Sequence, residues 1–336
     1  MIKIVVDAFG GDKSPEVNVI GTIKALNEIK DLEVVLTGDE DILNEKLAGY
    51  EYDKSRLHIV DAKGVISCEE KPTMAIRRKD TSMGVAFDLL KNDESVKGMV
   101  SIGSSGALLA GGVLKIGRIK GVKRPAFCPI VPTMTGGVVA ICDSGSNVDC
   151  TAEYLNQFAT MGSIYMQKAF GVENPRVALL NVGVESEKGD LLRKETYALL
   201  KENKNINFVG NMESRDLLTG SYDLVVCDGF SGNVLIKTTE GTAMELLKKI
   251  KQIFTKNLKN KLGALLLKDD IYDLKNYMDY NNYGGAVFLG ATKTIVKGHG
   301  GSKSEAVYNC VKQAYKLEKN KLIDEIANAM QEISEE

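Results

Sequence analysis

Short runs rich in β-branched residues alternate along this chain with longer stretches of helix-forming residues. Glycine or polar turn residues separate each run from the helical stretch that follows it. This alternation predicts βα units, and hence a mostly parallel sheet with helices on both of its faces. The runs lie at residues 2–8, 32–38, 56–62, 97–103, 138–147, 176–183, 206–211 and 224–230.

The sequence predicts one α/β domain over residues 1–336. No stretch rich in Pro, Gly or Ser divides the chain, and no segment repeats at a fixed period. With 336 residues and 44% hydrophobic composition, the chain can bury a large core. Its formal net charge of −2 gives no overall basic field, so we expect no nucleic acid partner.

Two features of the sequence bear on its location. Met1 leads directly into "IKIVVDA", without the charged and apolar leader that is typical of an exported protein. No apolar run approaches the roughly 18 residues that a membrane span requires. We therefore expect a cytoplasmic protein whose contact with the membrane is peripheral, at the inner face of the cell membrane.

The six cysteines lie in apolar segments and show no CxxC spacing. This distribution predicts buried, reduced thiols and no zinc or other metal site. The cysteines are Cys68, Cys128, Cys142, Cys150, Cys227 and Cys310.

Glycine together with Asp, Asn or Ser follows several predicted strands directly. In open α/β sheets, ligands bind in the crevice beyond the carboxyl ends of the strands, so these loops predict a shared cleft. "SIGSSGALLAGG" at residues 101–112 bares backbone amides at a predicted helix N-terminus, which favours an anion. Neither G-x-G-x-x-G after the first strand nor a P-loop is present, so the pattern favours small phosphate-like groups over nucleotides. The loops are residues 7–15, 101–107, 142–149, 181–190 and 227–233.

Seven segments of the chain together resemble the PlsX family of phosphate acyltransferases. That family converts the fatty acyl thioester of acyl carrier protein and inorganic phosphate into acyl phosphate for phospholipid synthesis, by way of phosphatidic acid. The segments occur in the family's order from Val6 to about Ala314. They are "VDAFGGDKSPE", "SIGSSGALLAGG", "SNVDCTAEYLNQFATMGSIYM", "NVGVESEKGD", "CDGFSGNVLIKTTEG", "YGGAVFLG" and "GHGGSKSEA".

The resemblance implies a doubly wound, three-layer α/β/α fold like that of phosphotransacetylases and isocitrate dehydrogenases, to which the pattern of the chain itself adds a protruding helical subdomain. It also implies a homodimer, no cofactor, and a downstream acyl-phosphate:glycerol-3-phosphate acyltransferase that takes up the product. The sequence departs from the family at Phe9, where Met is common, and at Ser104 and Ser105, where Asn and Thr are usual. Ser144 and Ser146 replace the common Val and Ala. These changes keep the glycines and the hydroxyl character, but they leave the polar contacts at residues 104 and 105 open.

Acyl transfer from a thioester to phosphate needs a positioned phosphate, a stabilised oxyanion and a proton for the leaving thiol. His299 could protonate the thiolate or hold phosphate, or its ring could simply close a glycine-rich loop. Lys188 could neutralise phosphate, or could be an exposed lysine of its loop. Asn233 could bind phosphate or the carbonyl oxygen, or could cap a helix that begins at Val234. We interpret these three residues as catalytic.

A wider set of loop residues is predicted to bind phosphate or the rest of the substrate. His58, inside a predicted strand, is expected to be structural, and the role of Asp228 stays open. Cys150 or Cys227 as an acyl-carrying nucleophile is disfavoured, because each adjoins an acid that raises a thiol pKa. The predicted set is Asp7, Gly10, Gly11, Asp12, Lys13, Gly103, Ser104, Ser105, Gly106, Asn147, Asp149, Gly183, Ser231, Gly232 and Ser302.

Residues 246–268 form a basic amphipathic pattern in an otherwise slightly acidic chain, and we assign residues 246–280 to a helical protrusion. The lysines could attract anionic lipid or the acidic acyl carrier protein, and the leucines could contact membrane or a second subunit. The alternative is a helix packed on the core with a solvated lysine face. The predicted contact residues are Lys256, Lys259, Lys261, Leu265, Leu266 and Leu267.

Other functions remain open at the level of sequence. The chain could be a phosphate acetyl- or butyryltransferase that uses acyl-coenzyme A, although the basic segment argues against this. It could also be a membrane or carrier-protein scaffold without catalytic activity, against which Lys188, Asn233 and His299 argue. A metal-dependent dehydrogenase is less favoured, since the sequence offers no evident carboxylate cluster with a nucleotide loop.

Overall fold

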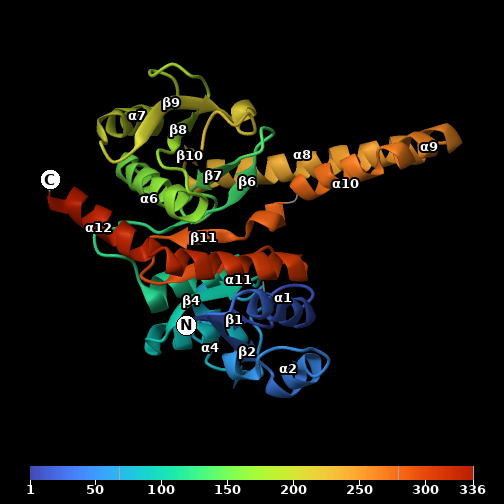
Figure 1. Ribbon diagram of the computed structural model, residues 1–336. Helices are drawn as coiled ribbons and strands as arrows, with labels where there is room; N and C mark the ends of the chain where they lie inside the picture. The colour runs from blue at the N-terminus through green and yellow to red at the C-terminus, as the bar shows by residue number, and fades with distance from the viewer. Residues whose placement is uncertain (68, 279, 336) are drawn as a thin grey trace.

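The strands of the chain form two sheets, which lie one above the other in Figure 1. The computed structural model describes residues 1–67, 69–278 and 280–335, so Cys68 lies outside the described residues. The α/β class, with mostly parallel strands and helices on both faces, is confirmed. The strands are divided between two sheets, where the alternation of runs suggested one.

The first sheet has the strand order β3-β2-β1-β4-β12-β11-β5. Its first five strands are parallel, and β11 runs antiparallel to both of its neighbours. The strands are β1 (Ile2–Asp7), β2 (Leu32–Gly38), β3 (Leu57–Asp61), β4 (Val96–Ser101), β5 (Ala126–Cys128), β11 (Ala286–Leu289) and β12 (Thr294–Lys297).

The second sheet has the order β6-β7-β10-β8-β9, with β6 antiparallel and the other four strands parallel. Its strands are β6 (Ile130–Pro132), β7 (Val138–Cys142), β8 (Arg176–Asn181), β9 (Asn207–Glu213) and β10 (Leu224–Val226).

Helices cover both faces of each sheet. In the first sheet, α1 and α11 contact one face and α4 the other, because alternate residues of β1 point to opposite sides. In the second sheet, α6 and α7 pack on one face and the start of α8 on the other. The helices of the body are α1 (Glu16–Glu28), α2 (Glu40–Leu47), α3 (Pro72–Ala75), α4 (Ser82–Asn92), α5 (Ser105–Gly111), α6 (Ala152–Phe170), α7 (Leu191–Glu202), α11 (Ser304–Lys319) and α12 (Leu322–Glu335).

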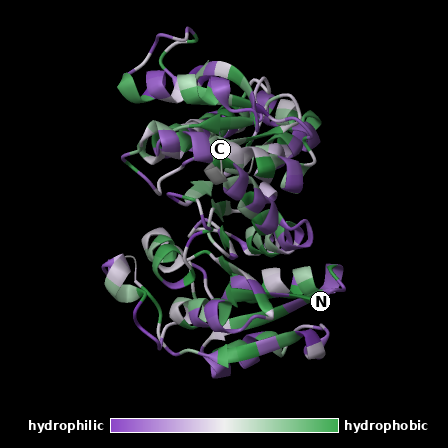
Figure 2. Ribbon diagram, turned by 90° about the vertical axis from the view of Figure 1, so that its left-hand side faces the viewer, coloured by the Kyte–Doolittle hydropathy of each residue, from purple (hydrophilic) through white to green (hydrophobic). Residues whose placement is uncertain are grey.

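A continuous hydrophobic core joins the two sheets. One cluster of buried residues includes Ile4 of β1, Phe158 of α6 and Val226 of β10, so it extends through both halves of the molecule. Figure 2 shows the hydrophobic colour concentrated along the strands of each half. A π-helical turn, η2 (Gly112–Ile116), continues α5, and short 3₁₀ turns lie at Lys54–Arg56, Ser214–Asp216 and Tyr280–Tyr283.

An arm of three helices extends away from the body (Figure 1). It consists of the C-terminal half of α8 (Gly229–Thr255), then α9 (Leu258–Leu266) and α10 (Lys268–Tyr277). The buried residues of α8 all lie in its first turns, and α9 has none. The basic amphipathic stretch at 246–268 is divided at Lys256 between α8 and α9, and Asn257 caps α9 by accepting a hydrogen bond from the Asn260 amide at 2.9 Å. Within the described residues, no helix combines the length and apolarity needed to cross a membrane.

Candidate active site

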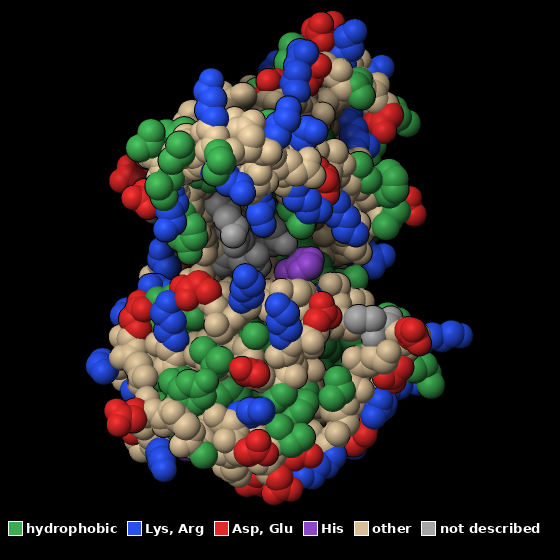
Figure 3. All heavy atoms as spheres, turned by 90° about the vertical axis from the view of Figure 1, so that its right-hand side faces the viewer, with side chains coloured by type: hydrophobic (Ala, Val, Ile, Leu, Met, Phe, Trp, Pro, Cys, Tyr) green, Lys and Arg blue, Asp and Glu red, His purple; other side chains and the backbone are tan. Residues whose placement is uncertain are grey.

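A pocket of about 190 Å³ opens where loops from the two sheets meet. Ser105, at the start of α5, and His299, after β12, come from the first sheet. Ser144, after β7, and Asn233, in α8, come from the second. Figure 3 shows a hollow between the two halves, with a histidine at its edge and Lys and Arg side chains around it. Three predicted site residues, Ser105, Asn233 and His299, therefore line the same pocket.

The ring of His299 is oriented by its own loop. Its Nδ1 accepts a hydrogen bond from the Gly301 amide at 3.1 Å, so the neutral ring carries its proton on Nε2. The side chain is exposed, while Ser302 beside it is 2% exposed. The Ser302 hydroxyl has no hydrogen-bond partner among the described residues, and the Ser302 amide donates to the His299 carbonyl at 3.0 Å. The ring thus closes its loop through Nδ1, and a catalytic role for His299 stays a prediction.

The first turn of α8 holds a polar cluster beside Asn233. Asp228 is the N-cap and accepts hydrogen bonds from the Ser231 amide and hydroxyl, both at 2.8 Å. Arg193 of α7 donates to Ser231 at 3.0 Å and also pairs with Asp228. Burial raises the pKa of Asp228, but the Ser231 hydrogen bonds and the Arg193 charge outweigh it and leave the pKa below its ordinary value.

This geometry corrects the expected start of the helix. The helix begins at Gly229, not at Val234, so Asn233 and Ser231 do not cap it. Ser231 lines a separate pocket of about 540 Å³ with Arg193 and Asn181, while Asn233 faces the pocket that contains His299. Gly232 has a packing role, because an added Cβ would lie 1.9 Å from the Asp143 carbonyl oxygen.

The loop after β1 contacts the loops after β4 and β12. Asp7 is buried and accepts hydrogen bonds from the Ser82 hydroxyl at 2.6 Å and the Ser101 hydroxyl at 2.7 Å. Burial raises the pKa of Asp7, and these hydrogen bonds oppose that rise. A Cβ on Gly10 would lie 2.7 Å from the Gly103 amide nitrogen, so only glycine allows this approach. Asp7 therefore holds the loops together from beneath.

The other predicted residues of these loops lie closer to the surface. The Asp12 amide donates to the Gly300 carbonyl at 2.9 Å, which joins the first loop to that of His299. Asp12 and Lys13 are exposed, and Gly11 has a positive φ of 92°. Ser104 caps α5 by accepting from the Ala107 amide at 3.4 Å. An added Cβ on Gly106 would lie 2.8 Å from Cγ of Pro72, and one on Gly103 would lie 2.9 Å from the flexible end of the Met83 side chain.

The loop after β7 is organised around a buried carboxylate. Asp143 accepts hydrogen bonds from the amides of Phe127, Ser146 and Asn147 and from the Asn147 side chain. Asn147 also donates to the Pro125 carbonyl at 2.8 Å, so its amide group is occupied by the fold. Asp149 is exposed on the same loop. A ligand role for Asn147 or Asp149 stays a prediction.

Lys188 lies in the exposed loop after β8 and does not line the pocket of His299. Its carbonyl accepts a hydrogen bond from the Asn181 side chain at 3.1 Å. Gly183 is buried beneath it, and an added Cβ would lie 3.0 Å from Cγ of Lys188. A catalytic role for Lys188 also stays a prediction.

Sequence reasoning missed several charged residues of the site. Lys237 and Glu240 of α8, and Lys297 at the end of β12, line the pocket with His299. Burial raises the pKa of Glu240, and the Lys237 charge lowers it by less. Lys237 and Glu240 lie four and seven residues after Asn233, the spacing of one helical face. That spacing would have identified both residues once the helix start was placed at Gly229.

Burial makes Cys150 and Cys227, the two cysteines weighed as nucleophiles, poor candidates for an activated thiol. Cys128, Cys142, Cys227 and Cys310 are buried, Cys150 is partly buried, and all five are free. Burial raises the pKa of Cys150 to about 12, and burial and the Asp228 charge raise that of Cys227. These shifts oppose a thiolate nucleophile at neutral pH. Among the described residues, no group of three or more His, Cys, Asp or Glu side chains could hold a metal ion.

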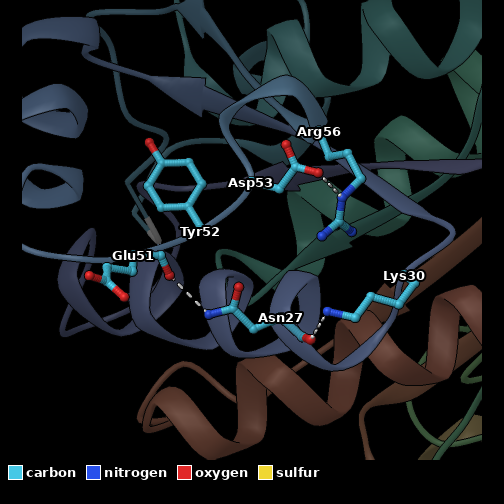
Figure 4. A pocket seen from close by; sticks show the side chains of 6 residues that line it. All are labelled: Asn27, Lys30, Glu51, Tyr52, Asp53 and Arg56. Carbon is cyan, nitrogen blue, oxygen red and sulfur yellow. Dashed lines mark hydrogen bonds and ion pairs between the residues drawn. The ribbon is translucent and has the colours of Figure 1, made fainter.

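A further pocket, drawn in Figure 4, lies beside α1 and the loop before β3. Arg56 in its wall is almost fully buried and donates to the carbonyls of Leu26, Ile29 and Leu32. It also pairs with Asp53 at 2.9 Å. Through these contacts Arg56 connects α1 to β2, which is a structural role. None of the residues that line this pocket belongs to the predicted site.

The predicted contact residues lie on the arm and are exposed. Leu266 at its tip is 85% exposed. Apolar side chains of the three arm helices line a groove of about 510 Å³. The groove includes Leu247, Ile250, Phe254, Ala264 and Ile271. The expected alternative, a helix packed on the core with only its lysine face in solvent, is therefore not what the arm adopts.

Comparison with known proteins gives a consistent picture. A family model described as "Fatty acid synthesis protein" matches residues 2–325. The chain is 42% identical to a phosphate acyltransferase of Clostridioides difficile over 336 residues, which is all of this chain and 98% of that protein. It is 46% identical to a phosphate acyltransferase of Clostridium perfringens over 327 residues, 97% of this chain and 96% of that protein.

Solved structures resemble the fold at low sequence identity. A phosphotransacetylase from Streptococcus pyogenes aligns with a TM-score of 0.62 and 16% identity, covering 94% of each chain. A branched-chain phosphotransacylase from Enterococcus faecalis aligns with a TM-score of 0.58 and 16% identity, covering 94% of this chain and 98% of that one. At this identity the likeness defines the fold.

Proposed function

This chain belongs to the phosphate acyltransferase family, an acyltransferase family that transfers acyl groups to phosphate, and on that premise we propose that its donor is the fatty acyl thioester of acyl carrier protein. The product would be an acyl phosphate for phospholipid synthesis, taken up by a downstream acyl-phosphate:glycerol-3-phosphate acyltransferase. The observation that carries the proposal is the pocket lined by Ser105, Asn233 and His299 between the two sheets.

In the proposed reaction, a phosphate oxygen attacks the thioester carbonyl and forms the new O–C bond, so the carbonyl oxygen becomes an oxyanion. Collapse of this intermediate breaks the C–S bond, and the leaving thiolate takes up the proton that the attacking hydrogen phosphate gives up. The Nε2–H group of His299 would donate a hydrogen bond to the oxyanion or to the leaving sulfur. The amide of Asn233 and the hydroxyl of Ser105 would hold phosphate. Lys188, which does not line this pocket, would supply positive charge from the loop after β8.

The charges of the pocket support an anionic substrate. Lys237 and Lys297 line it together with a single acid, Glu240. Burial raises the pKa of Glu240 and so favours its neutral form. The two lysines therefore give the pocket a net positive charge, which would attract phosphate.

We propose that the arm contacts the membrane or acyl carrier protein, which would keep a cytoplasmic enzyme peripheral to the inner face of the membrane. Lys256, Lys259 and Lys261 would attract anionic lipid or the acidic carrier, each worth about 1 kcal/mol near a charged surface. Leu265, Leu266 and Leu267 would enter lipid or meet a second subunit in a homodimer. Reversing the three lysine charges should weaken vesicle binding or raise the KM for carrier protein. Unchanged values of both would contradict this role.

The first experiment measures acyl phosphate formed by the purified protein from palmitoyl-acyl carrier protein and inorganic phosphate, with acetyl-coenzyme A as the competing donor. Product from the carrier-protein donor supports the proposal, whereas preference for acetyl-coenzyme A would favour a soluble acetyl- or butyryltransferase. A folded protein that makes no product from either donor would favour a scaffold without activity.

The site itself is tested by a matched pair of histidine variants. We expect His299→Ala to lower kcat/KM by about 10²–10³, the range for loss of one hydrogen-bond donor to an oxyanion. His58→Ala serves as the control, because His58 lies on β3 and pairs with Glu33 at 3.0 Å, outside the pocket. Equal losses in the two variants would argue against a catalytic His299. The values of kcat/KM for Asn233→Ala and Lys188→Ala then compare a residue that lines the pocket with one that does not.

A further inference from the structure

A second pocket, of about 380 Å³, lies beside the first and is lined by cations. One wall is the outer side of α5 and η2, with Leu109 and Val113. The facing wall is the loop after β7, with Ser146 and Asn147. The third side is the segment 117–125, which we call the basic loop. It supplies Arg118, Lys123 and Arg124.

The three cations carry more charge than their neighbours neutralise. Lys123 forms an ion pair with Glu153 at 3.4 Å, in which both side chains are more than half exposed. The guanidinium of Arg124 lies 5.9 Å from the centre of the Tyr154 ring, and that of Arg118 donates to the Lys123 carbonyl. None of the lining residues is acidic, so the pocket presents a net positive surface.

The basic loop is held firmly in place. The Gln157 side chain, on α6, donates to the Gly121 carbonyl at 2.9 Å and accepts from the Lys123 amide at 2.8 Å. The Ile119 amide donates to the Gly290 carbonyl at 2.9 Å. These bonds fix the loop backbone between α6 and the turn after β11. The cations therefore project from a preorganised frame, which lowers the entropic cost of binding an anion.

The two pockets follow one another along the same helix face. Ser105 lines the first pocket, and Leu109 and Val113 line the second, at intervals of four residues. On the opposite side, Ser144 belongs to the first pocket and Ser146 to the second. The eight residue steps from Ser105 to Val113 span about 12 Å along a helix.

This spacing fits the arm of an acyl thioester donor. A pantetheine chain between its sulfur and its phosphate has the backbone length of about four amino-acid residues, about 14 Å when extended. A thioester at the pocket of His299 would therefore place the phosphate ester of the same arm near the basic loop. Arg is well suited to bind such a phosphate, since its donors match phosphate oxygens.

We propose that the second pocket binds the phosphate ester of the pantetheine arm of the donor, through Arg124, Lys123 and Arg118. The proposal rests on the proposed function, because it takes a pantetheine thioester as the donor. The same phosphate ester occurs in acyl carrier protein and in coenzyme A, so both donors would place it here. Acyl-pantetheine, which lacks the phosphate, would not use the site.

The experiment compares binding of 4′-phosphopantetheine and pantetheine to the full-length protein by calorimetry, without any turnover. We expect the phosphate to tighten binding about tenfold or more, as a charge-assisted hydrogen bond does. Lys123→Gln/Arg124→Gln should remove most of this difference. Lys120→Gln is the matched control, because Lys120 is exposed on the same loop and does not line the pocket.

Kinetics with three donors then identify the source of the phosphate. In the double variant, kcat/KM should fall about tenfold, relative to palmitoyl-pantetheine, for each phosphate-bearing donor that the wild type uses, whether palmitoyl-acyl carrier protein or palmitoyl-coenzyme A. An equal loss with all three donors would overturn the proposal. So would an equal effect of Lys120→Gln, which would indicate a diffuse field. If phosphopantetheine binds no more tightly than pantetheine, the proposed phosphate site is wrong, even if the enzyme forms acyl phosphate. If instead the wild-type protein forms no acyl phosphate from any donor, the proposed function itself has failed.

Discussion

Asp143 shows how one side chain can organise a loop of the site. It is fully buried and receives hydrogen bonds from three backbone amides and from Asn147. Burial raises the pKa of Asp143, and the hydrogen bonds from Asn147 and Ser146 oppose that rise. Because Ser144 and Ser146 of this loop face the two pockets, the position of both walls depends on this carboxylate.

Asp143→Ala should lower the free energy of unfolding by about 3 kcal/mol, since it leaves several buried donors without an acceptor. Asp149→Ala, an exposed change in the same loop, should alter it by less than about 0.5 kcal/mol. Urea unfolding of both variants measures the difference. Similar stabilities for the two variants would mean that the buried hydrogen bonds contribute little.

Glu240 gives the pocket a pH-dependent stability. Burial raises its pKa in the folded protein, so the folded state binds more protons than the unfolded state as pH rises above the ordinary value of 4.5. This carboxyl therefore destabilises the fold increasingly through that window. Glu240→Gln should stabilise the protein at pH 7.5 more than at pH 4, as measured by unfolding at both values. Glu245→Gln, on the exposed side of the same helix, controls for the loss of one negative charge. If Glu240→Gln raised the free energy of unfolding equally at both pH values, the expectation would be wrong.

At the scale of elements, α8 is tightly packed at its start and exposed further along. Its first turns pack against the loop after β7, where Gly232 leaves no room for a Cβ. Further along, an added Cβ on Gly241 would meet nothing within 4 Å. The same residue type therefore marks a tight contact at one position and an unconstrained helix surface at the other.

Alanine at these two glycines should have opposite effects on stability. Gly232→Ala should destabilise the protein by about 1–3 kcal/mol through overpacking against the Asp143 carbonyl. Gly241→Ala should stabilise it by about 0.5–1 kcal/mol, because alanine is the better helix former. Thermal unfolding of the two single variants measures both. Stabilisation by both changes would show that the first turn of α8 moves to admit a methyl group.

The sequence predicted the strands more closely than the helix ends. Runs at 2–8 and 32–38 match β1 and β2, because β-branched residues mark buried strands strongly. The start of α8 was misplaced by several residues, since Ser, Gly and Asn at 231–233 look like a cap, whereas Asp228 performs that role. With the helix start misplaced, Lys237 and Glu240 were not recognised as lying on the same helix face as Asn233. The glycine-rich loops did identify Ser105 and His299.

At the scale of the whole molecule, local patterns could not predict that the strands divide into two sheets. Alternation indicates which segments are strands, but pairing depends on contacts between distant segments, such as β12 beside β4. The shared pocket arises from that pairing, because it brings loops after β4 and β12 opposite loops after β7 and β10. The glycine-rich loops predicted a shared cleft, but they did not predict which loops lie opposite one another.

The arm should be the part of the chain that exchanges backbone hydrogen fastest. No residue of α9 is buried, whereas β1, β4 and β10 are largely or fully buried. We expect amides of α9 to exchange at least tenfold faster than those strands in the isolated protein at low concentration. Anionic vesicles, acyl carrier protein and increasing protein concentration are then added in turn, and slower exchange identifies what covers the arm. Slow exchange at high dilution would mean that the arm is stable by itself.

The helix α8 belongs both to the pocket and to the arm. Asn233, Lys237 and Glu240 line the pocket, and Met244, Ile250 and Phe254 line the groove of the arm. Its 27 residues make a rod of about 40 Å with no break between the two regions. Any tilt of α8 as a rigid rod would therefore move the residues that line the pocket together with those that line the groove.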